Sequence, residues 1–112
     1  MSILFATHES YLDHVVGPRH PERPARLGAV IDGANVLADC LVPVVPKAAE
    51  RHQLTRVHRV EHLERIEAVV AAGGGRLDPD TSASSGSWTA ALLAAGAGLT
   101  AIERLAAGAG DA

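Results

Sequence analysis

Histidines are the first candidates for chemistry in this chain, which has six of them. His58 and His62 are four residues apart, a spacing that on one helix would place both rings on the same face as metal ligands. Glu61, however, does not hold the position of the general base in the metalloprotease motif, and no third ligand is evident. We therefore interpret His58 and His62 as structural histidines.

Two other motifs fit chemistry only in part. Ser10, Asp13 and His14 contain the residue types of a hydrolytic set, but no nucleophile elbow surrounds the serine. Residues 96–101 (GAGLTA) have the glycine spacing of a dinucleotide fingerprint, yet a helix-forming alanine run precedes them where the fingerprint needs a strand. We expect these glycines to allow close helix packing instead.

Three ordered segments carry a stronger signal. Residues 14–27 (HVVGPRHPERPARL) resemble the first long loop of class II-like histone deacetylases, a family that includes bacterial acetoin-utilisation and acetylpolyamine deacetylases. Residues 54–63 (LTRVHRVEHL) are similar to the family's L-x-x-V-H-x-x-E-Y-L element, with His62 where a tyrosine is usual. Residues 77–81, Ser84, Ser87 and the alanine run from 90 to 96 resemble the second loop and the helix behind it.

The resemblance implies a zinc amidohydrolase of the α/β class. The expected fold is the N-terminal part of an arginase/deacetylase-like three-layer domain with a parallel sheet. In the whole enzyme, zinc-activated water would hydrolyse an acyl-lysine or an acylated polyamine amide. The family's zinc ligands and catalytic residues come later than residue 112, so we assign no catalytic and no metal-binding residue within this chain.

The resemblance does assign residues to the walls of the active site. Arg26 matches an arginine that lines the internal channel through which acetate leaves, where a guanidinium can bind a carboxylate with two hydrogen bonds. His20, Pro21 and Glu22 are expected to form the wall of the substrate tunnel. Alternatively, Arg26 is an exposed helix residue and Glu22 stabilises the positive end of a helix.

Asp80 and Ser84 fall where the second loop would meet the rim of the tunnel. The resemblance implies a hydrogen bond from either residue to the backbone of a substrate. Asp and Ser serve more commonly in turns and caps, so the structural role is the one we favour.

The elements needed to position these residues follow from hydrophobic spacing. Residues 3–6 are expected to form a strand, and residues 41–46 an edge strand or merely an extended segment because of their prolines. Apolar residues spaced three and four apart predict a helix from Pro24 to about Asp39. Residues 48–72 are expected to form two helices that meet near residues 58–61, and three glycines end the second. A polar loop without a hairpin should follow, then a long helix capped by Ser85 or Ser87. Its expected core stripe is Trp88, Leu92, Ala95, Leu99, Ile102 and Ala106.

Composition narrows the range of partners. The net charge of −3 gives no reason to expect nucleic-acid binding. No uninterrupted apolar run reaches the roughly 20 residues of a membrane span, and no basic leader precedes the first apolar run. Cys40 is the single cysteine, which excludes an internal disulfide. We expect a cytoplasmic protein without nucleic-acid or membrane partners.

Residues 1–112 are expected to be one unit, the N-terminal segment of a deacetylase domain that ends before the zinc-binding motifs. Such a segment would be inactive alone and would need the remainder of its domain as a partner. The alternative is a non-enzymatic helical interaction module derived from the same family. In that case the apolar last helix would be buried against a partner or a second copy.

Overall fold

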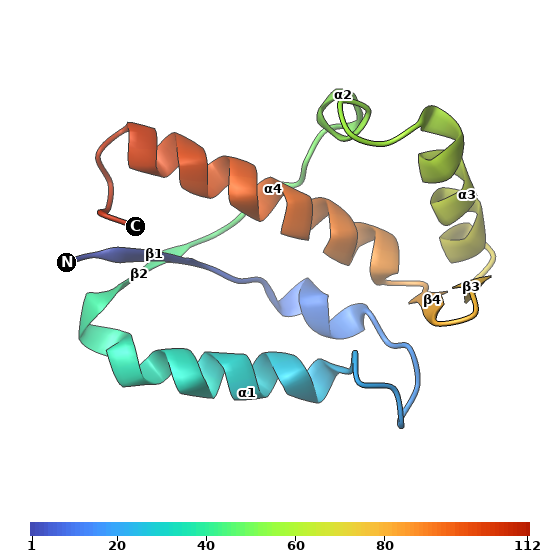
Figure 1. The fold of residues 1–112 in the computed structure, drawn as a ribbon, viewed down its shortest axis with the longest axis horizontal. Coiled ribbons are helices and arrows are strands. Elements are labelled where there is room, and N and C mark those ends of the chain that lie inside the picture. The colour runs from blue at the N-terminus through green and yellow to red at the C-terminus, as the bar shows by residue number, and fades with distance from the viewer.

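The computed structural model describes residues 1–112 and has a flattened shape of 43 × 34 × 18 Å (Figure 1). Helices and strands alternate along the chain. In order, the elements are β1 (Ile3–Ala6), the 3-10 helix η1 (Glu9–Asp13), α1 (Pro24–Ala34), the 3-10 helix η2 (Asn35–Cys40), β2 (Leu41–Val44), α2 (Arg51–Leu54), α3 (Val60–Ala71), β3 (Gly74–Asp78), β4 (Thr81–Ser84) and α4 (Ser87–Ala106).

The predicted parallel sheet is confirmed by the pairing of β1 with β2, in which Ile3 lies opposite Leu41 and Ala6 opposite Val44. Parallel strands need a long crossover connection, and here η1, α1 and η2 supply it. Figure 1 shows β1 and β2 running between α1 and α4. The chain therefore has the α/β architecture expected from its sequence.

The segment after α3 differs from the prediction. We expected residues 76–86 to form a polar loop without a hairpin, but β3 and β4 pair as antiparallel strands with a bulge between Arg76 and Asp78. The connection is only two residues long, and the backbone N–H of Asp80 donates to Asp78 Oδ1 at 3.1 Å. Glycines and serines make up much of both strands, so they lack the alternating apolar pattern by which a hairpin is recognised.

The helical region between β2 and the hairpin contains the predicted break. α2 is a single turn, whose Glu50–Gln53 capping box begins it three residues later than expected. Residues 55–59 separate it from α3, which ends before the three glycines as predicted. The first long helix also stops early, because α1 gives way at Asn35 to the tighter turns of η2.

The buried face of α4 is not the predicted one. It consists of small residues and one leucine, namely Ser87, Ala90, Leu93, Gly96 and Thr100. Two members of the predicted stripe, Leu99 and Ile102, are 36% and 66% exposed. Nor does Ser85 or Ser87 cap the helix, since Gly86 holds the N-cap position without a side-chain hydrogen bond.

Close backbone approach explains which face of α4 is buried. A Cβ atom on Gly96 would lie 1.7 Å from the carbonyl oxygen of Lys47. In the same region Ala49 N donates to Leu92 O at 2.9 Å, and Lys47 N donates to Thr100 Oγ1 at 3.1 Å. The expectation of close packing is thus confirmed for Gly96. It is wrong for Gly98, which faces open space.

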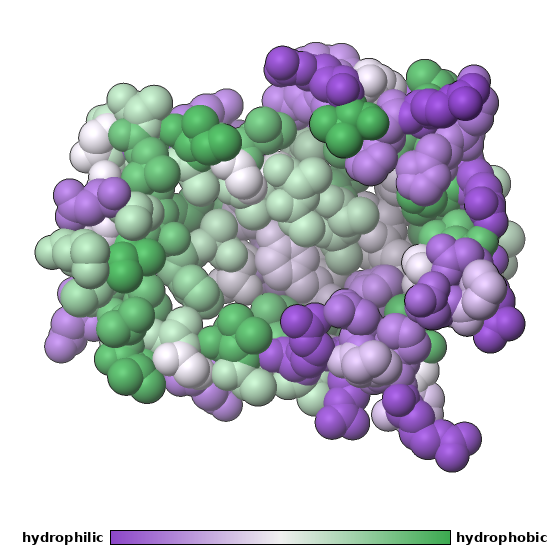
Figure 2. All heavy atoms as spheres, viewed as in Figure 1, coloured by the Kyte–Doolittle hydropathy of each residue, from purple (hydrophilic) through white to green (hydrophobic).

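Only ten of the 112 residues are buried, so much apolar surface remains exposed. Figure 2 shows hydrophobic residues gathered over β1, β2 and the C-terminal half of α4, whereas hydrophilic residues predominate at the α3 and hairpin end. α4 is the one helix long and apolar enough to cross a membrane by length and composition. Only 22% of that stretch is buried, where α4 packs against η1 and β1.

Candidate functional site

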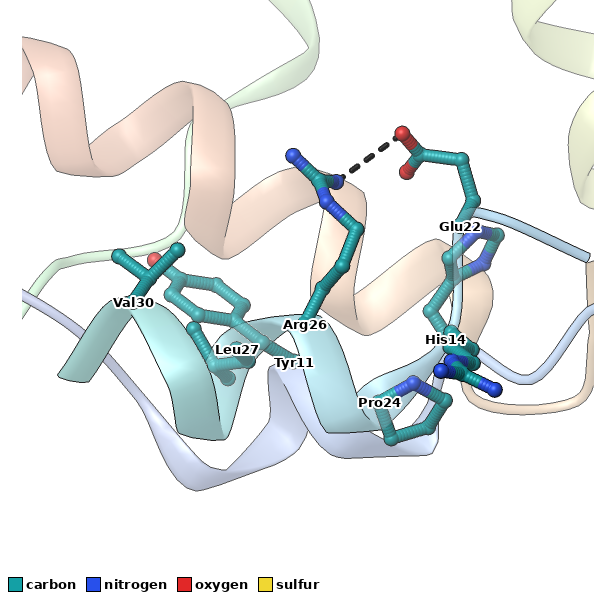
Figure 3. A pocket seen from close by; sticks show the side chains of 8 residues that line it. Tyr11, His14, Glu22, Pro24, Arg26, Leu27 and Val30 are labelled. Carbon is teal, nitrogen blue, oxygen red and sulfur yellow. Dashed lines mark hydrogen bonds and ion pairs between the residues drawn. The ribbon is translucent and has the colours of Figure 1, made fainter. Parts of the chain in front are cut away.

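A groove of about 570 Å³ lies between the start of α1 and the first half of α4. A smaller cavity of about 250 Å³ at the start of α1 adjoins it (Figure 3). Four residues line both spaces, namely Tyr11, His14, Glu22 and Arg26. The remaining groove residues come from α3, the hairpin and α4, and are Ile66, Leu77, Thr81, Ser82, Ala83, Ser87, Ala90, Ala91 and Ala94.

Arg26 and Glu22 form an ion pair at the start of α1. Arg26 Nη1 lies 3.0 Å from Glu22 Oε1, and the two side chains are 61% and 59% exposed. An exposed pair of this kind contributes only about 0–1 kcal/mol to stability. The pair orients the two charged groups, which Figure 3 shows directed toward each other at the smaller cavity. The structure thus brings together two of the predicted wall residues.

His20 links the first loop to the hairpin. Its Nδ1 atom accepts the backbone N–H of Glu22 at 3.1 Å, so the proton of the neutral ring resides on Nε2. Nε2 lies 3.2 Å from the carbonyl oxygen of Asp80, to which it donates. His20 and Asp80, predicted separately as wall and rim residues, are therefore in contact. Neither they nor Pro21 line the groove itself.

Ser84 ties the hairpin to the first loop. Its Oγ atom donates to the carbonyl oxygen of Asp13 at 2.6 Å and accepts the backbone N–H of Val15 at 3.0 Å. These bonds serve the structural role that we favoured for Ser84. They fix the chain on both sides of His14, which is held beside the groove as a result.

Tyr11, His14 and Ser87 line the groove, although no site role was predicted for them from the sequence. The Tyr11 hydroxyl donates to Leu93 O at 3.2 Å, and burial raises the pKa of this side chain. His14 Nδ1 lies 2.7 Å from Ser87 Oγ, although the two residues are 73 positions apart. His14 is the first residue of the first deacetylase-like segment, and Ser87 belongs to the third. Their place in these segments is the sequence feature by which both could have been predicted as site residues.

Gly86 permits the contact between the first loop and α4. A Cβ atom at this position would lie 2.4 Å from Asp13 Cβ and 2.7 Å from the Asp13 carbonyl oxygen. Any side chain would push the loop away from the start of α4. Since Asp13 and Gly86 directly precede His14 and Ser87, their close approach sets the distance between those two side chains.

The 112 residues do not assemble a metal site. No group of three or more His, Cys, Asp or Glu side chains converges to hold an ion. The His58 and His62 rings are 5.4 Å apart between centroids on an exposed part of the chain. A catalytic zinc takes three protein ligands, so the residues present do not fit one by themselves.

Comparison with known proteins agrees with this architecture. A family model for the histone deacetylase domain matches residues 20–112. A histone deacetylase-like amidohydrolase of Pseudomonas aeruginosa is 35% identical over 91 residues, which cover 81% of this chain and 24% of that protein. A probable deacetylase of Archaeoglobus fulgidus is 33% identical over 100 residues, which cover 86% of this chain and 28% of that protein.

A solved structure gives the same result in three dimensions. The crystal structure of the HDA15 HD domain superposes with a TM-score of 0.71 and 31% identity, covering 85% of this chain and 29% of the other. An α/β segment with a parallel strand pair and this groove therefore belongs to the deacetylase class of hydrolase folds. The chain is a member of the histone deacetylase family. It spans between 24% and 29% of the length of these relatives.

Proposed function

We propose that residues 1–112 form the N-terminal wall of the active site in a deacetylase that removes acyl groups from acyl-lysine or acylated polyamine amides. The supporting observation is the groove. Residues of the first and third deacetylase-like segments line it, with Glu22 and Arg26 from the first and Leu77 from the third. Ile66, which follows the second segment on α3, lines it as well.

Arg26 would bind the carboxylate that amide hydrolysis releases. Glu22 occupies one of its N–H groups, and a guanidinium has five, so several remain for a ligand. His20 and Pro21 would hold Glu22 in place through the His20–Asp80 link. Asp80 and Ser84 would stand at the rim, where a hydrogen bond to the substrate backbone is part of the proposal.

Zinc chemistry would come from the remainder of the deacetylase domain. Because residues 1–112 gather no ligand set, their part is to bind, orient and enclose rather than to activate water. The proposed partners are therefore the rest of the domain and an acylated amine. We further propose that the protein has no nucleic-acid partner, because its net charge is −3. A cytoplasmic location without membrane partners is part of the same proposal.

Hydrolysis assays test this proposal directly. The 112-residue chain and the product of the complete reading frame would be purified and supplied with an acetyl-lysine peptide or N-acetylputrescine, with and without zinc. We expect zinc-dependent hydrolysis by the complete protein and none by the 112-residue chain. Hydrolysis by the short chain alone would contradict the division of roles.

An interaction module derived from the same family is the competing function. Exposed apolar side chains on α4, among them Leu99, Ile102 and Leu105, are the observation that favours it. Such a module would form a defined oligomer and would show no hydrolysis in any form of the protein. Sedimentation of the same samples separates the two functions.

A further inference from the structure

We propose that His14 is a further ligand-binding residue of the groove, presented by Ser84 and Ser87 so that its Nε2 atom can donate or accept a hydrogen bond to a short-chain carboxylic acid or its anion. The inference extends the proposed function and relies on it only for the source of that ligand. It begins from the hydrogen bonds around His14, which can be counted completely.

The Ser87 hydroxyl is the centre of this network. Ser87 is 7% exposed, and its Oγ atom accepts the backbone N–H of Ser84 at 2.7 Å. The same oxygen lies 2.7 Å from His14 Nδ1 and 3.1 Å from Ser84 Oγ. The Ser84 hydroxyl donates its single proton to the Asp13 carbonyl oxygen. The Ser87 proton is consequently the one that can rotate, toward either His14 or Ser84.

Two arrangements satisfy every polar group. In the first, Ser87 donates to His14 Nδ1, and the ring carries its proton on Nε2. In the second, His14 Nδ1–H donates to Ser87, and Ser87 donates to Ser84 Oγ. Rotation of one hydroxyl group therefore supports His14 as a donor at Nε2, as an acceptor at Nε2, or as a protonated ring, without leaving a buried group unpaired.

The Nε2 atom is the part of His14 that remains for a ligand. None of the chain's hydrogen bonds uses it, whereas both ring nitrogens of His20 are occupied. His14 is half-buried in the wall of the groove, beside Arg26 and Glu22 (Figure 3). His20 is thus fixed in one tautomer, while the network around His14 leaves its outward nitrogen free to change role.

The lining of the groove indicates the ligand class. Glu22 and Arg26 are its only charged side chains, and Glu22 leaves most of the Arg26 N–H groups unused. Arg26 and His14 together offer donors to an oxygen anion, while methyl groups of Ala83, Ala90 and Ala94 line the groove as well. A small carboxylate with a short alkyl chain suits a site with donors and small apolar side chains.

Acetate binding provides the test, with variants of His14 that separate its two nitrogens. The Asn side chain can reproduce the bond of Nδ1 to Ser87 but does not reach the position of Nε2, whereas Gln extends to that position. In the complete protein we expect His14→Asn to weaken binding of ¹³C-acetate about tenfold, and His14→Gln to keep it within about twofold. His58→Asn, at an exposed position outside the groove, is the matched control.

¹⁵N NMR of the histidine rings in the unmodified protein supplies a second readout, which does not depend on the folding of a variant. In ¹⁵N-histidine spectra, acetate should move the His14 signals toward a protonated Nε2 while the His58 signals stay in place. The inference would be overturned if the Asn variant bound acetate as tightly as the unmodified protein. It would also be overturned if the His14 signals did not change on addition of acetate. Acetate binding without any acyl-amide hydrolysis would instead contradict the proposed function and leave the role of His14 standing.

Discussion

The two ends of the molecule are held in different ways. At the groove end, side chains bond the first loop to segments at least 60 residues away, as in His14–Ser87, Val15–Ser84 and His20–Asp80. At the sheet end, β1 and β2 pair through their backbones, and large apolar side chains such as Val36 (85%) and Ile102 (66%) remain exposed. The groove end fixes its geometry within the chain, whereas the sheet end presents surface that only further packing can bury.

Gly96 offers the largest test of this contrast, because it is the point where α4 meets the segment after β2. Gly96→Ala should destabilise the chain by about 1–3 kcal/mol, since the new methyl group overlaps the Lys47 carbonyl oxygen. Gly98→Ala, two residues along the same helix in open space, should stabilise it by about 0.5–1 kcal/mol. Urea unfolding of both variants measures the difference, and equal effects would mean that this close approach does not exist.

Ser84 tests the groove end alone. Ser84→Ala removes the bonds to Asp13 and Val15 and should cost about 1–2 kcal/mol. Hydrogen exchange at the Val15 amide should accelerate, because that N–H loses its acceptor. Ser82→Ala, at a neighbouring groove position with no side-chain hydrogen bond, should change stability by less than about 0.5 kcal/mol. A protected Val15 amide in Ser84→Ala would argue against the network.

Ile102 tests the sheet end. Ile102→Asp replaces a side chain that is 66% exposed, so the free energy of unfolding of the 112-residue chain should change by less than about 0.5 kcal/mol. Self-association should fall, since the substitution interrupts an apolar surface. Sedimentation velocity at several concentrations measures this. A large loss of stability would show that Ile102 is packed within the chain.

Asp78 gives the smallest expected effect, confined to the hairpin turn. Hydrogen bonds from the Thr81 side chain and then from Asp80 hold the pKa of Asp78 below its usual 3.8. A depressed carboxyl pKa contributes stability above the unfolded value, and that contribution is lost as the pH falls through the folded value. The Asp80 amide should therefore lose protection below about pH 3.8. Asp78→Asn should remove that pH dependence, as followed by NMR.

Sequence reasoning succeeded where local chemistry determines structure. The three glycines follow the end of α3 as predicted, and the break predicted near residues 58–61 corresponds to the separation of α2 from α3 at residues 55–59. It failed where tertiary contact decides. The face of α4 depends on Lys47 approaching Gly96, and the His14–Ser87 contact depends on Asp13 approaching Gly86. Neither approach leaves a periodic signature, because glycine contributes nothing to hydrophobic spacing.

Acetate inhibition of an Arg26 variant tests whether the residues around this groove belong to a deacetylase active site. The measurement is the affinity of the complete protein for acetate, taken as the inhibition constant of acetate in hydrolysis of an acetyl-lysine peptide, with and without Arg26→Ala. We predict a loss of at least about tenfold, as for removal of a charged ligand contact. The unfolding free energy should change by less than about 1 kcal/mol, because the Arg26–Glu22 pair is exposed. An unchanged acetate inhibition constant in the variant would mean that Arg26 does not bind the released carboxylate.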